Sequence, residues 1–306
     1  MALAIGIDLG GTKTEVVAMD EGGAELIRRR RPTPRGDYEG TLDGIVGLVL
    51  EAERELGRRG TVGVSHPGAI SPATGLIKNA NSTWLLGRAF DKDLSARLDR
   101  PVAFANDANC LALSEATDGA GAGSEVVFAV ILGTGVGGGV VMNGRVATGP
   151  NAIAGEWGHN PLPWPGDDER PGPDCYCGLK GCVETWLSGR GLAADHARVT
   201  GEEVLGPEIV RRAEAGDAAA NATMERYEDR LARGLATIIN MLDPDTIVLA
   251  GGVSNIRRLY ANVPARWDRY VFSDKVATKL SPPLHGDSTG VRGAAWLGRS
   301  LAASPG

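Results

Sequence analysis

Three of the four cysteines lie close together in the chain, at Cys175, Cys177 and Cys182, and His159 precedes them. Three thiolates and one imidazole form the ligand set of a closed, tetrahedral Zn²⁺ site. A disulfide is the alternative, but the fourth cysteine, Cys110, lies in a different segment, and the sequence begins without a secretory signal. The spacing of the cysteines and the expected cytoplasmic compartment therefore favour a metal site over a disulfide. The sequence predicts a structural zinc site formed by these three cysteines and His159.

Two carboxylates lie beside these four residues: Glu156 is three residues before His159, and Glu184 is two residues after Cys182. A metal that fixes the imidazole and the thiolates would also hold both glutamates in place, so this segment would become a wall for a polar ligand. The segment 160–174 holds five prolines and predicts a loop, because proline disrupts helices and central strands. The simpler interpretation is that zinc only stabilises the fold of this loop and has no part in binding a ligand. The loop could cover a binding site or contact another subunit.

The first glycine-rich turn lies between the apolar runs 3–8 and 15–19. Two such runs around glycines predict a β-hairpin. Its tip is not a P-loop, because Gly-Lys-Ser/Thr is missing and a strand follows in place of a helix. Backbone N–H groups, a hydroxyl and an amine can still cradle phosphate, and an aspartate before the tip can hold hydrated Mg²⁺. An ordinary hairpin turn explains this segment equally well. The residues assigned to phosphate and metal are Asp8, Gly10, Gly11, Thr12 and Lys13.

The second glycine-rich turn follows the apolar run 126–132 and contains Gly133, Thr134 and Gly135. Its glycines match the dinucleotide-binding pattern G-x-G-x-x-G by spacing. That interpretation fails, because β-branched residues and an Asn-Gly turn follow in place of a helix. The order of strand, glycine tip and strand instead repeats the first turn. The sequence therefore predicts an internal repeat.

The repeat continues after each hairpin with a helix and a short buried strand. Apolar residues keep helical spacing over 42–50 before the strand 62–64, and over 227–242 before the strand 246–250. Two similar α/β lobes with a cleft between them follow from this pattern, with boundaries at 1–118 plus 290–306 and at 119–289. A nucleotide could place its phosphates between the two glycine tips and its adenosine near Gly251 and Gly252.

A further carboxylate lies where the apolar strand 102–105 meets a helix over 108–116, at Asn106-Asp107. The simpler interpretation is that Asp107 caps the helix. Phosphoryl transfer, however, needs a base that accepts the proton of the attacking hydroxyl. Because the chain already offers a phosphate cradle, a carboxylate for Mg²⁺ and a polar wall, Asp107 is the best candidate for that base.

Composition excludes several classes of protein. The 306 residues predict about two domains. A net charge of −6, with no long basic run beyond 28–31, argues against binding of nucleic acid. No window approaches 18 consecutive apolar residues, and an acidic residue comes too early for a signal peptide, so we expect a cytoplasmic protein without a membrane segment.

Together the motifs resemble the ROK family of sugar kinases over nearly the whole chain. The motifs that carry this resemblance are Asp8-x-Gly10-Gly11-Thr12-Lys13, Asn106-Asp107, Gly133-Thr134-Gly135, Gly155-Glu156-x-Gly158-His159 and Cys175-x-Cys177-Gly178-x-x-Gly181-Cys182-x-Glu184. Each turn alone is weakly specific, but their joint order is highly specific. The resemblance implies an α/β fold of the two-lobed, actin-like ATPase type, which is hexokinase-type and ribonuclease H-like, with a cleft between the lobes.

The resemblance also implies roles for individual residues. Asp107 resembles the general base of the family. The two glycine turns resemble the turns that bind the phosphates of ATP with Mg²⁺. His159 would bind Zn²⁺ through one ring nitrogen and the sugar through the other. The residues similar to the family's sugar contacts are Asn81, Asn106, Asp107, Glu156, His159 and Glu184. The partners implied are a hexose and ATP, and a second copy in a homodimer.

The segments 78–84, 105–115 and 155–164 look closest to bacterial fructokinases that also accept mannose. We therefore expect transfer of the ATP γ-phosphoryl group to the 6-hydroxyl of fructose. Kinases of N-acetylglucosamine, N-acetylmannosamine and glucose share most of the motifs and are the alternative. Where the family often has Gly-Ile-Pro-Gly, this chain has Ser65-His66-Pro67-Gly68, and we interpret His66 as a locally bonded histidine.

Sugar-sensing regulators of the same family are the rival from another class. They carry an N-terminal helix-turn-helix domain. Here the first hairpin begins at about residue 3 and the chain is acidic, which disfavours a regulator.

Overall fold

The computed structural model describes residues 3–286 and 289–303. The chain divides into two compact units. The first comprises Met1–Gly123, Gly139–Ala154 and Leu284–Gly306, and the second comprises Ser124–Gly138 and Gly155–Pro283. The lobe boundaries expected from the sequence remain a prediction, and their residues 1–2, 287–288 and 304–306 lie outside the described part of the chain.

The first five-stranded sheet has the order β3-β2-β1-β4-β7. Strands β1 (Ala4–Leu9) and β2 (Lys13–Met19) pair antiparallel, with Leu9 opposite Thr14, so the predicted glycine-tipped hairpin is confirmed. Strand β3 (Glu25–Pro32) extends the hairpin, while β4 (Thr61–His66) and β7 (Val102–Asn106) run parallel to β1. Parallel strands end at the same edge of a sheet. Asp8 and Asn106 therefore come from the same edge.

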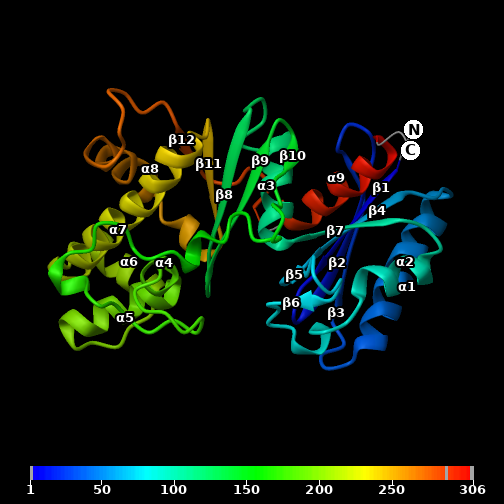
Figure 1. Ribbon diagram of the computed structural model, residues 1–306, viewed down its shortest axis with the longest axis horizontal. Helices are drawn as coiled ribbons and strands as arrows, with labels where there is room; N and C mark the ends of the chain where they lie inside the picture. Colours follow the sequence, from blue (N-terminus) through cyan, green and yellow to red (C-terminus); the bar gives the residue numbers. More distant parts are fainter. Residues whose placement is uncertain (1–2, 287–288, 304–306) are drawn as a thin grey trace. The chain divides into compact units, whose positions relative to one another are not determined.

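Alternation along β1 divides its side chains between two layers of helix. Ile5 and Ile7 belong to the apolar core that also holds α1 (Tyr38–Leu56) and α2 (Phe90–Leu98), whereas Ala4 packs with α9 (Thr289–Ala303). Figure 1 shows α9, at the red end of the chain, beside β1 and β4. The helix α1 begins at Asp37, whose side chain accepts the N–H of Gly40, and it ends at Gly57 in the left-handed conformation.

Glycine is required where α9 lies on this sheet. A Cβ at Gly63 of β4 would be 1.9 Å from the carbonyl oxygen of Ala294, and one at Gly6 of β1 would be 2.1 Å from that of Val291. The neighbouring helix α3 (Asp107–Asp118) makes a similar approach, because a Cβ at Gly293 would be 1.7 Å from the carbonyl oxygen of Cys110. Close packing of α9 against β1, β4 and α3 therefore explains part of the glycine surplus.

Between α1 and α3 the chain forms short elements beside the first sheet. These are β5 (Ala69–Ile70) and β6 (Ile77–Lys78), which pair with each other, and the 3-10 turn η1 (Thr83–Leu85). His66, at the end of β4, is buried between Phe90 and Phe104, and its Nδ1 lies 3.1 Å from the carbonyl oxygen of Pro67. The interpretation of His66 as a locally bonded histidine is confirmed.

The second five-stranded sheet has the order β10-β9-β8-β11-β12. Strands β8 (Val126–Leu132), β9 (Val136–Met142) and β10 (Arg145–Val146) follow one another, and β11 (Thr246–Ala250) and β12 (Lys279–Ser281) add parallel to β8. This is the arrangement of the first sheet, in which three successive strands precede two parallel ones. The internal repeat predicted from the glycine tips is confirmed.

Strands β8, β11 and β12 of this sheet lie in the second unit, whereas β10 and most of β9 fall in the segment Gly139–Ala154 of the first unit. The second unit also contains helices. Its helices are α4 (Val183–Leu187), α5 (Gly189–Thr200), α6 (Gly206–Glu214), α7 (Ala218–Leu242) and α8 (Leu259–Asn262). Its 3-10 turns are η2 (Trp157–His159), η3 (Asp167–Glu169), η4 (Gly252–Asn255) and η5 (Pro264–Arg269). The helix expected over 227–242 is therefore the second half of α7.

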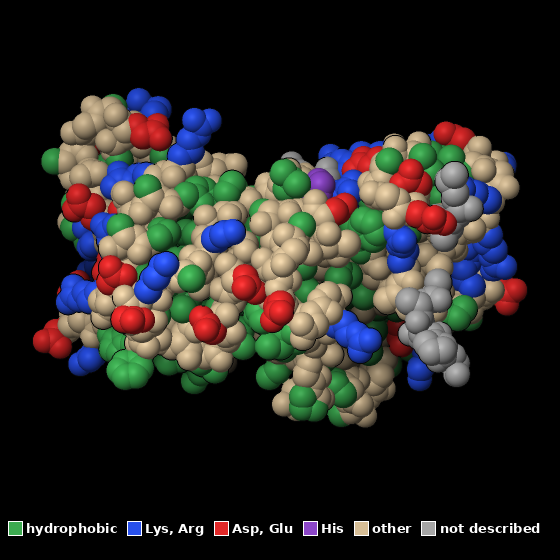
Figure 2. Space-filling view, turned by 90° about the horizontal axis from the view of Figure 1, so that it is seen from above, with side chains coloured by type: hydrophobic (Ala, Val, Ile, Leu, Met, Phe, Trp, Pro, Cys, Tyr) green, Lys and Arg blue, Asp and Glu red, His purple; other side chains and the backbone are tan. Residues whose placement is uncertain are grey.

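The surface carries acidic and basic side chains mixed together, as the face in Figure 2 shows. This agrees with a chain of 32 basic and 38 acidic residues. None of the helices in the described ranges is both long enough and apolar enough to span a membrane.

Candidate active site

The candidate base lies at the junction of β7 and α3 in the first unit. Asn106 is the N-cap of α3, because its side chain accepts the N–H of Asn109 at 2.8 Å. The alternative of Asp107 as the N-cap is therefore wrong. Asp107 is exposed in the first turn of the helix, where its Oδ1 accepts the N–H of Ala108 at 2.8 Å. Since Asn106 caps the helix, the carboxylate of Asp107 is not needed for that purpose.

Asp8 lies at the carboxyl end of β1, where its Oδ1 accepts a hydrogen bond of 2.8 Å from the hydroxyl of Ser65. Burial raises the pKa of Asp8 to about 6, and the nearby carboxylates of Asp107 and Glu15 add to the rise, while the bond from Ser65 and the charge of Lys13 oppose it. Carboxylates that raise one another's pKa would be stabilised by a cation. Oxygen donors of this kind suit Mg²⁺, so the residues present fit the predicted ion.

The first glycine tip is a closed, exposed turn. The N–H of Gly10 donates to the carbonyl oxygen of Lys13 at 2.9 Å, and a Cβ at Gly10 would be only 2.9 Å from that oxygen. Thr33, which directly follows β3 and is not among the predicted site residues, supports the turn. Its hydroxyl donates to the carbonyl oxygen of Gly10, and its N–H donates to that of Thr12. The backbone of the tip is therefore fixed before any ligand binds.

Asn81 is exposed and precedes the buried Ser82, whose Oγ would be 3.6 Å from a Cβ at Gly11. The first unit thus brings Ser82, the residue after Asn81, beside the glycine tip. It also brings Asp107 within electrostatic range of Asp8.

In the second unit, Glu184 is joined to the second glycine tip. Its Oε2 accepts the N–H of Val136 at 2.8 Å, and a Cβ at Gly135 would be 2.6 Å from the same oxygen. The N–H of Gly133 closes the tip by donating to the carbonyl oxygen of Gly135 at 3.0 Å. Glycine at 135 is therefore what allows this carboxylate to lie against the turn.

Gly251, one of the two residues assigned to adenosine, has a φ of 83° and lies against β8, where a Cβ would be 2.5 Å from the carbonyl oxygen of Leu132. The close approach explains why glycine is needed at this position. Around a Cβ at Gly252, in contrast, no atom of the described residues lies within 4 Å. The role of both glycines in binding adenosine stays a prediction.

The Gly-Glu-x-Gly-His segment is anchored on β9. The buried Trp157 donates from Nε1 to the carbonyl oxygen of Gly137 at 3.1 Å, and a Cβ at Gly158 would be 2.2 Å from the carbonyl oxygen of Val136. Gly155 has a φ of 93°, which favours glycine. These contacts fix the turn η2, and they leave Glu156 exposed.

His159 and the three cysteines come together as predicted. Their candidate ligand atoms all lie within 4.8 Å of one another, with 3.6 Å from Cys175 Sγ to His159 Nδ1 and 3.7 Å between the Sγ atoms of Cys177 and Cys182. Metal–ligand bonds of a tetrahedral Zn²⁺ site place the ligands about 3.4–3.8 Å apart. A disulfide would need sulfurs about 2 Å apart, and all four cysteines are free. The cluster therefore fits a tetrahedral metal ion.

The second ring nitrogen of His159, which the resemblance assigns to the sugar, lies 3.0 Å from the hydroxyl of Tyr176. Its role in binding the sugar stays a prediction. Tyr176 lies outside the predicted site residues, because the spacing of the cysteines on either side of it predicts metal ligands and gives no role to the residue between them. The aromatic residue type was the available signal.

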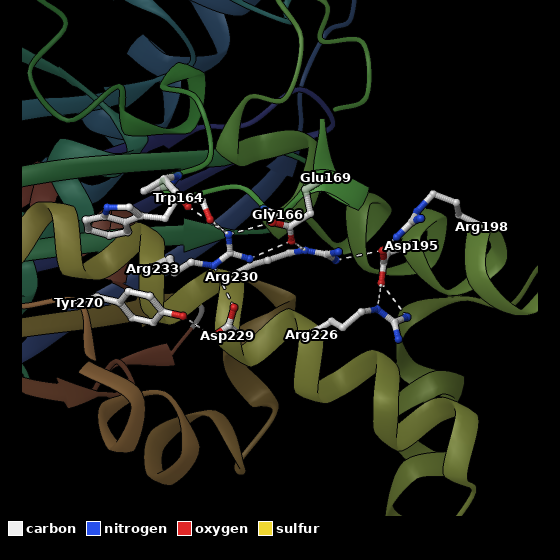
Figure 3. A network of polar contacts seen from close by, with 11 residues as sticks. Trp164, Gly166, Glu169, Asp195, Arg198, Arg226, Asp229, Arg230, Arg233 and Tyr270 are labelled. Carbon is white, nitrogen blue, oxygen red and sulfur yellow. Dashed lines mark hydrogen bonds and ion pairs between the residues drawn. The ribbon is translucent and has the colours of Figure 1, made fainter. Parts of the chain in front are cut away.

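Glu169 anchors the proline-rich loop on α7 (Figure 3). Its carboxylate accepts hydrogen bonds from Arg230 at 2.7 Å and from Arg233 at 2.8 and 2.9 Å. Burial would raise the pKa of Glu169, but the bonds from Arg233 and Arg230 outweigh it and hold the pKa at about 2. Arg230 also pairs with Asp195 of α5 at 3.0 Å. The loop that leads to Cys175 is thus attached to α7, which is itself paired with α5 through Arg230 and Asp195.

Comparison with known proteins agrees with this geometry. The ROK family matches residues 4–300. Two N-acetyl-D-glucosamine kinases, from Photobacterium profundum and Escherichia coli, are 41% and 40% identical over 296 residues, which cover 95% of this chain and 98% of each relative.

Among solved structures, the ROK hexokinase from Thermus thermophilus superposes with a TM-score of 0.88 at 31% identity, over 98% of this chain and 99% of that one. A ROK family glucokinase from Streptomyces griseus, solved with glucose and AMPPNP, gives a TM-score of 0.75 at 27% identity, over 98% and 100%. The fold is therefore the predicted α/β, actin-like ATPase fold of sugar kinases.

Proposed function

Because this chain belongs to the ROK family and is a carbohydrate kinase, we propose that it transfers the γ-phosphoryl group of ATP to the 6-hydroxyl of N-acetyl-D-glucosamine. The observation that carries the choice of sugar is the similarity to N-acetyl-D-glucosamine kinases at 40–41% identity over 98% of their length. These identities do not support the expected fructokinase. They favour a kinase of N-acetylglucosamine, which was one of the alternatives.

In the proposed reaction, the oxygen of the 6-hydroxyl forms a bond to the γ-phosphorus, and the bond from that phosphorus to the β,γ-bridging oxygen breaks. The proton of the hydroxyl passes to the carboxylate of Asp107, and the products are a sugar 6-phosphate and ADP. Support for Asp107 comes from its exposure at the start of α3 and from Asn106, which caps the helix in its place.

Asp8 would hold hydrated Mg²⁺, which neutralises charge on the phosphate oxygens when it is bound. The two glycine tips, Gly10–Lys13 and Gly133–Gly135, would offer to those phosphates the backbone N–H groups that do not close the turns themselves. The internal bonds of both tips support this role, because a turn that is already closed loses little entropy on binding.

The sugar would be bound through its hydroxyls by Asn81, Asn106, Glu156, His159 and Glu184. The cluster of His159 with the cysteines would hold a structural Zn²⁺, which fixes the wall that carries Glu156 and Glu184. We also propose ATP as the phosphoryl donor and a homodimer as the assembly, by the family resemblance.

Product analysis tests this proposal. The protein is incubated with Mg²⁺, ATP and N-acetylglucosamine, and the phosphorylated position is read from ³¹P–¹H NMR. We expect a 6-phosphate from the wild type and none from Asp107→Asn. The matched control is Asp99→Asn, an exposed left-handed C-cap of α2 where asparagine fits equally well. Equal turnover by Asp107→Asn and Asp99→Asn would remove Asp107 from the mechanism.

A further inference from the structure

Ser65 is a buried polar residue that the proposed mechanism does not use. It lies on β4 and begins the segment Ser65-His66-Pro67-Gly68, whose second residue is the locally bonded histidine. Its exposed fraction is 0%. A buried hydroxyl without a hydrogen bond would cost free energy, so the partner of this one indicates its role. That partner is the carboxylate of Asp8, whose Oδ1 accepts the hydroxyl at 2.8 Å.

Strand pairing brings the two side chains together. Asp8 of β1 is in register with Ser65 of β4 on one side and with Glu15 of β2 on the other. Residues paired in this way project to the same face of a sheet, so the three side chains form a row. Glu15 bonds to Arg30 at 2.7 and 3.0 Å. Within the described ranges, Ser65 is therefore the only residue that donates a hydrogen bond to the carboxylate of Asp8.

This bond makes the two oxygens of Asp8 different. Oδ1 is bonded to Ser65, whereas Oδ2 has no hydrogen-bond partner among residues 3–286 and 289–303. A Cβ at Gly290 of α9 would be 3.6 Å from Oδ1 and 3.7 Å from Oδ2, so glycine at this position leaves space beside the carboxylate. A carboxylate oxygen without a protein partner can bind Mg²⁺ or accept a hydrogen bond from its water. Oδ2 is the oxygen that remains for this purpose.

The donor itself is held firmly. Strand β4 lies between β1 and β7 in the first sheet, and the next residue, His66, is buried between Phe90 and Phe104. The terminal torsion of an aspartate is otherwise broad, so a carboxylate without a partner can turn. Ser65 cannot follow such a turn, and its bond therefore restricts the orientation of Asp8. A metal ligand that is already oriented loses less entropy when the ion binds.

We propose that Ser65 is a positioning residue for metal binding, whose hydroxyl holds Oδ1 of Asp8 and leaves Oδ2 for the hydrated Mg²⁺ that accompanies the nucleotide. This inference rests on the proposed function, since that function assigns Mg²⁺ to Asp8. It gives a role to a residue outside the predicted site. Ser65 acts through Asp8 and touches neither the sugar nor the phosphates.

Calorimetric titration with ADP, with and without saturating Mg²⁺, tests the proposal on Ser65→Ala. We expect Mg²⁺ to strengthen ADP binding by the wild type, and we expect this strengthening to be about tenfold smaller in the variant, because residues that orient a metal ligand affect metal affinity by about this factor. Affinity for ADP without Mg²⁺ should be unchanged. An equal effect of Mg²⁺ on the wild type and Ser65→Ala would overturn the proposal.

The matched control is Ser114→Ala. Ser114 of α3 is also 0% exposed, but its Oγ has no hydrogen-bond partner in the described part of the chain. Loss of this hydroxyl should leave the effect of Mg²⁺ at the wild-type value. A loss as large as that of Ser65→Ala would show that any buried serine in this unit matters equally, and would overturn the proposal.

A double-mutant cycle with Asp8→Asn separates positioning from a general structural effect. Since the hydroxyl acts through Asp8, Ser65→Ala should cause no further loss of the Mg²⁺ effect in the Asp8→Asn protein. A further loss of about tenfold there would contradict positioning. In turnover assays of Ser65→Ala alone, the half-saturating Mg²⁺ concentration should rise about tenfold, while KM for the sugar stays constant.

The binding data also separate this proposal from the proposed function. If the wild type phosphorylates no sugar, the proposed function fails, but a Mg²⁺ effect that is reduced in Ser65→Ala still supports the role of Ser65. If Mg²⁺ does not strengthen ADP binding by the wild type, the metal role of Asp8 and the positioning role of Ser65 are both overturned, whichever sugar is used.

Discussion

The ion pairs of Glu169 with Arg230 and Arg233 predict a large stability effect for Glu169→Gln. All three side chains are buried, with exposed fractions of 7%, 1% and 6%. The fall in the pKa of Glu169 from 4.5 to about 2 corresponds to about 3 kcal/mol, at about 1.4 kcal/mol per pKa unit. Removing one partner of a buried ion pair costs a similar amount, because the remaining charge stays buried. We therefore expect the second unit to lose about 3 kcal/mol at pH 7.

Urea unfolding followed by tryptophan fluorescence measures this loss. With an m-value near 3 kcal/mol/M, the midpoint should fall by about 1 M. The matched control is Glu208→Gln: Glu208 also pairs with two arginines, Arg211 and Arg212, but its side chain is 35% exposed. Water screens such a pair, so the control should be close to the wild type. Equal midpoints for the two variants would refute the reasoning.

The same ion pairs determine how the stability contributed by Glu169 depends on pH. Because the pKa of Glu169 is lower in the folded chain, its contribution is present above the unfolded value of about 4.5 and is lost as the pH falls towards 2. The difference between the wild type and Glu169→Gln should therefore shrink below about pH 4.5. Hydrogen exchange of residues 160–174 should show the loop opening first in the variant, since Glu169 is its buried anchor.

Three further predictions concern other parts of the molecule. Asp8→Asn should abolish turnover yet raise stability by roughly 3 kcal/mol at pH 7. Because the folded pKa of Asp8 is raised from 3.8 to about 6, this gain should vanish below pH 4 in denaturant titrations. Chelation of the metal, or Cys182→Ser, should increase hydrogen exchange around His159, and unchanged exchange would contradict a structural metal. Gly63→Ala should lower the melting temperature by well over 5 °C through its clash with Ala294, whereas Gly44→Ala in α1 should not lower it.

Local spacing predicted the parts of the site that lie close together in the chain. The hairpin of β1 and β2, the junction at Asn106-Asp107 and the cluster of His159 with three cysteines each depend on neighbouring residues. A turn between two apolar runs, or a set of thiolates within a few residues, has few other structural outcomes.

Contacts between distant residues could not be predicted in the same way. Glu169 meets Arg230 across 61 positions, and Thr33 braces Gly10 across 23. Arginines on a helix such as α7 are ordinarily exposed, so composition alone does not indicate that Arg230 and Arg233 are buried. Only the packing of the proline-rich loop on that helix makes them buried partners of a carboxylate.

The preferred sugar was the property that the sequence predicted least well. In the proposed mechanism, the glycine tips, Asp107 and the cysteine cluster serve phosphoryl transfer and folding, and the resemblance implies these roles for sugar kinases of the family in general. Preference depends on which side chains surround the sugar once distant segments have folded together, and short motifs do not specify these. Motifs for the common chemistry therefore predicted a kinase correctly and gave fructose too much weight.

The most direct test of the account is kcat/KM by coupled ADP release, measured with Mg²⁺ and ATP. The sugars compared are N-acetylglucosamine, N-acetylmannosamine, glucose, mannose and fructose, each at matched concentrations. We expect the highest value with N-acetylglucosamine. A higher value with fructose would contradict the proposed substrate, and turnover with none of the sugars would contradict the assignment as a hexose kinase.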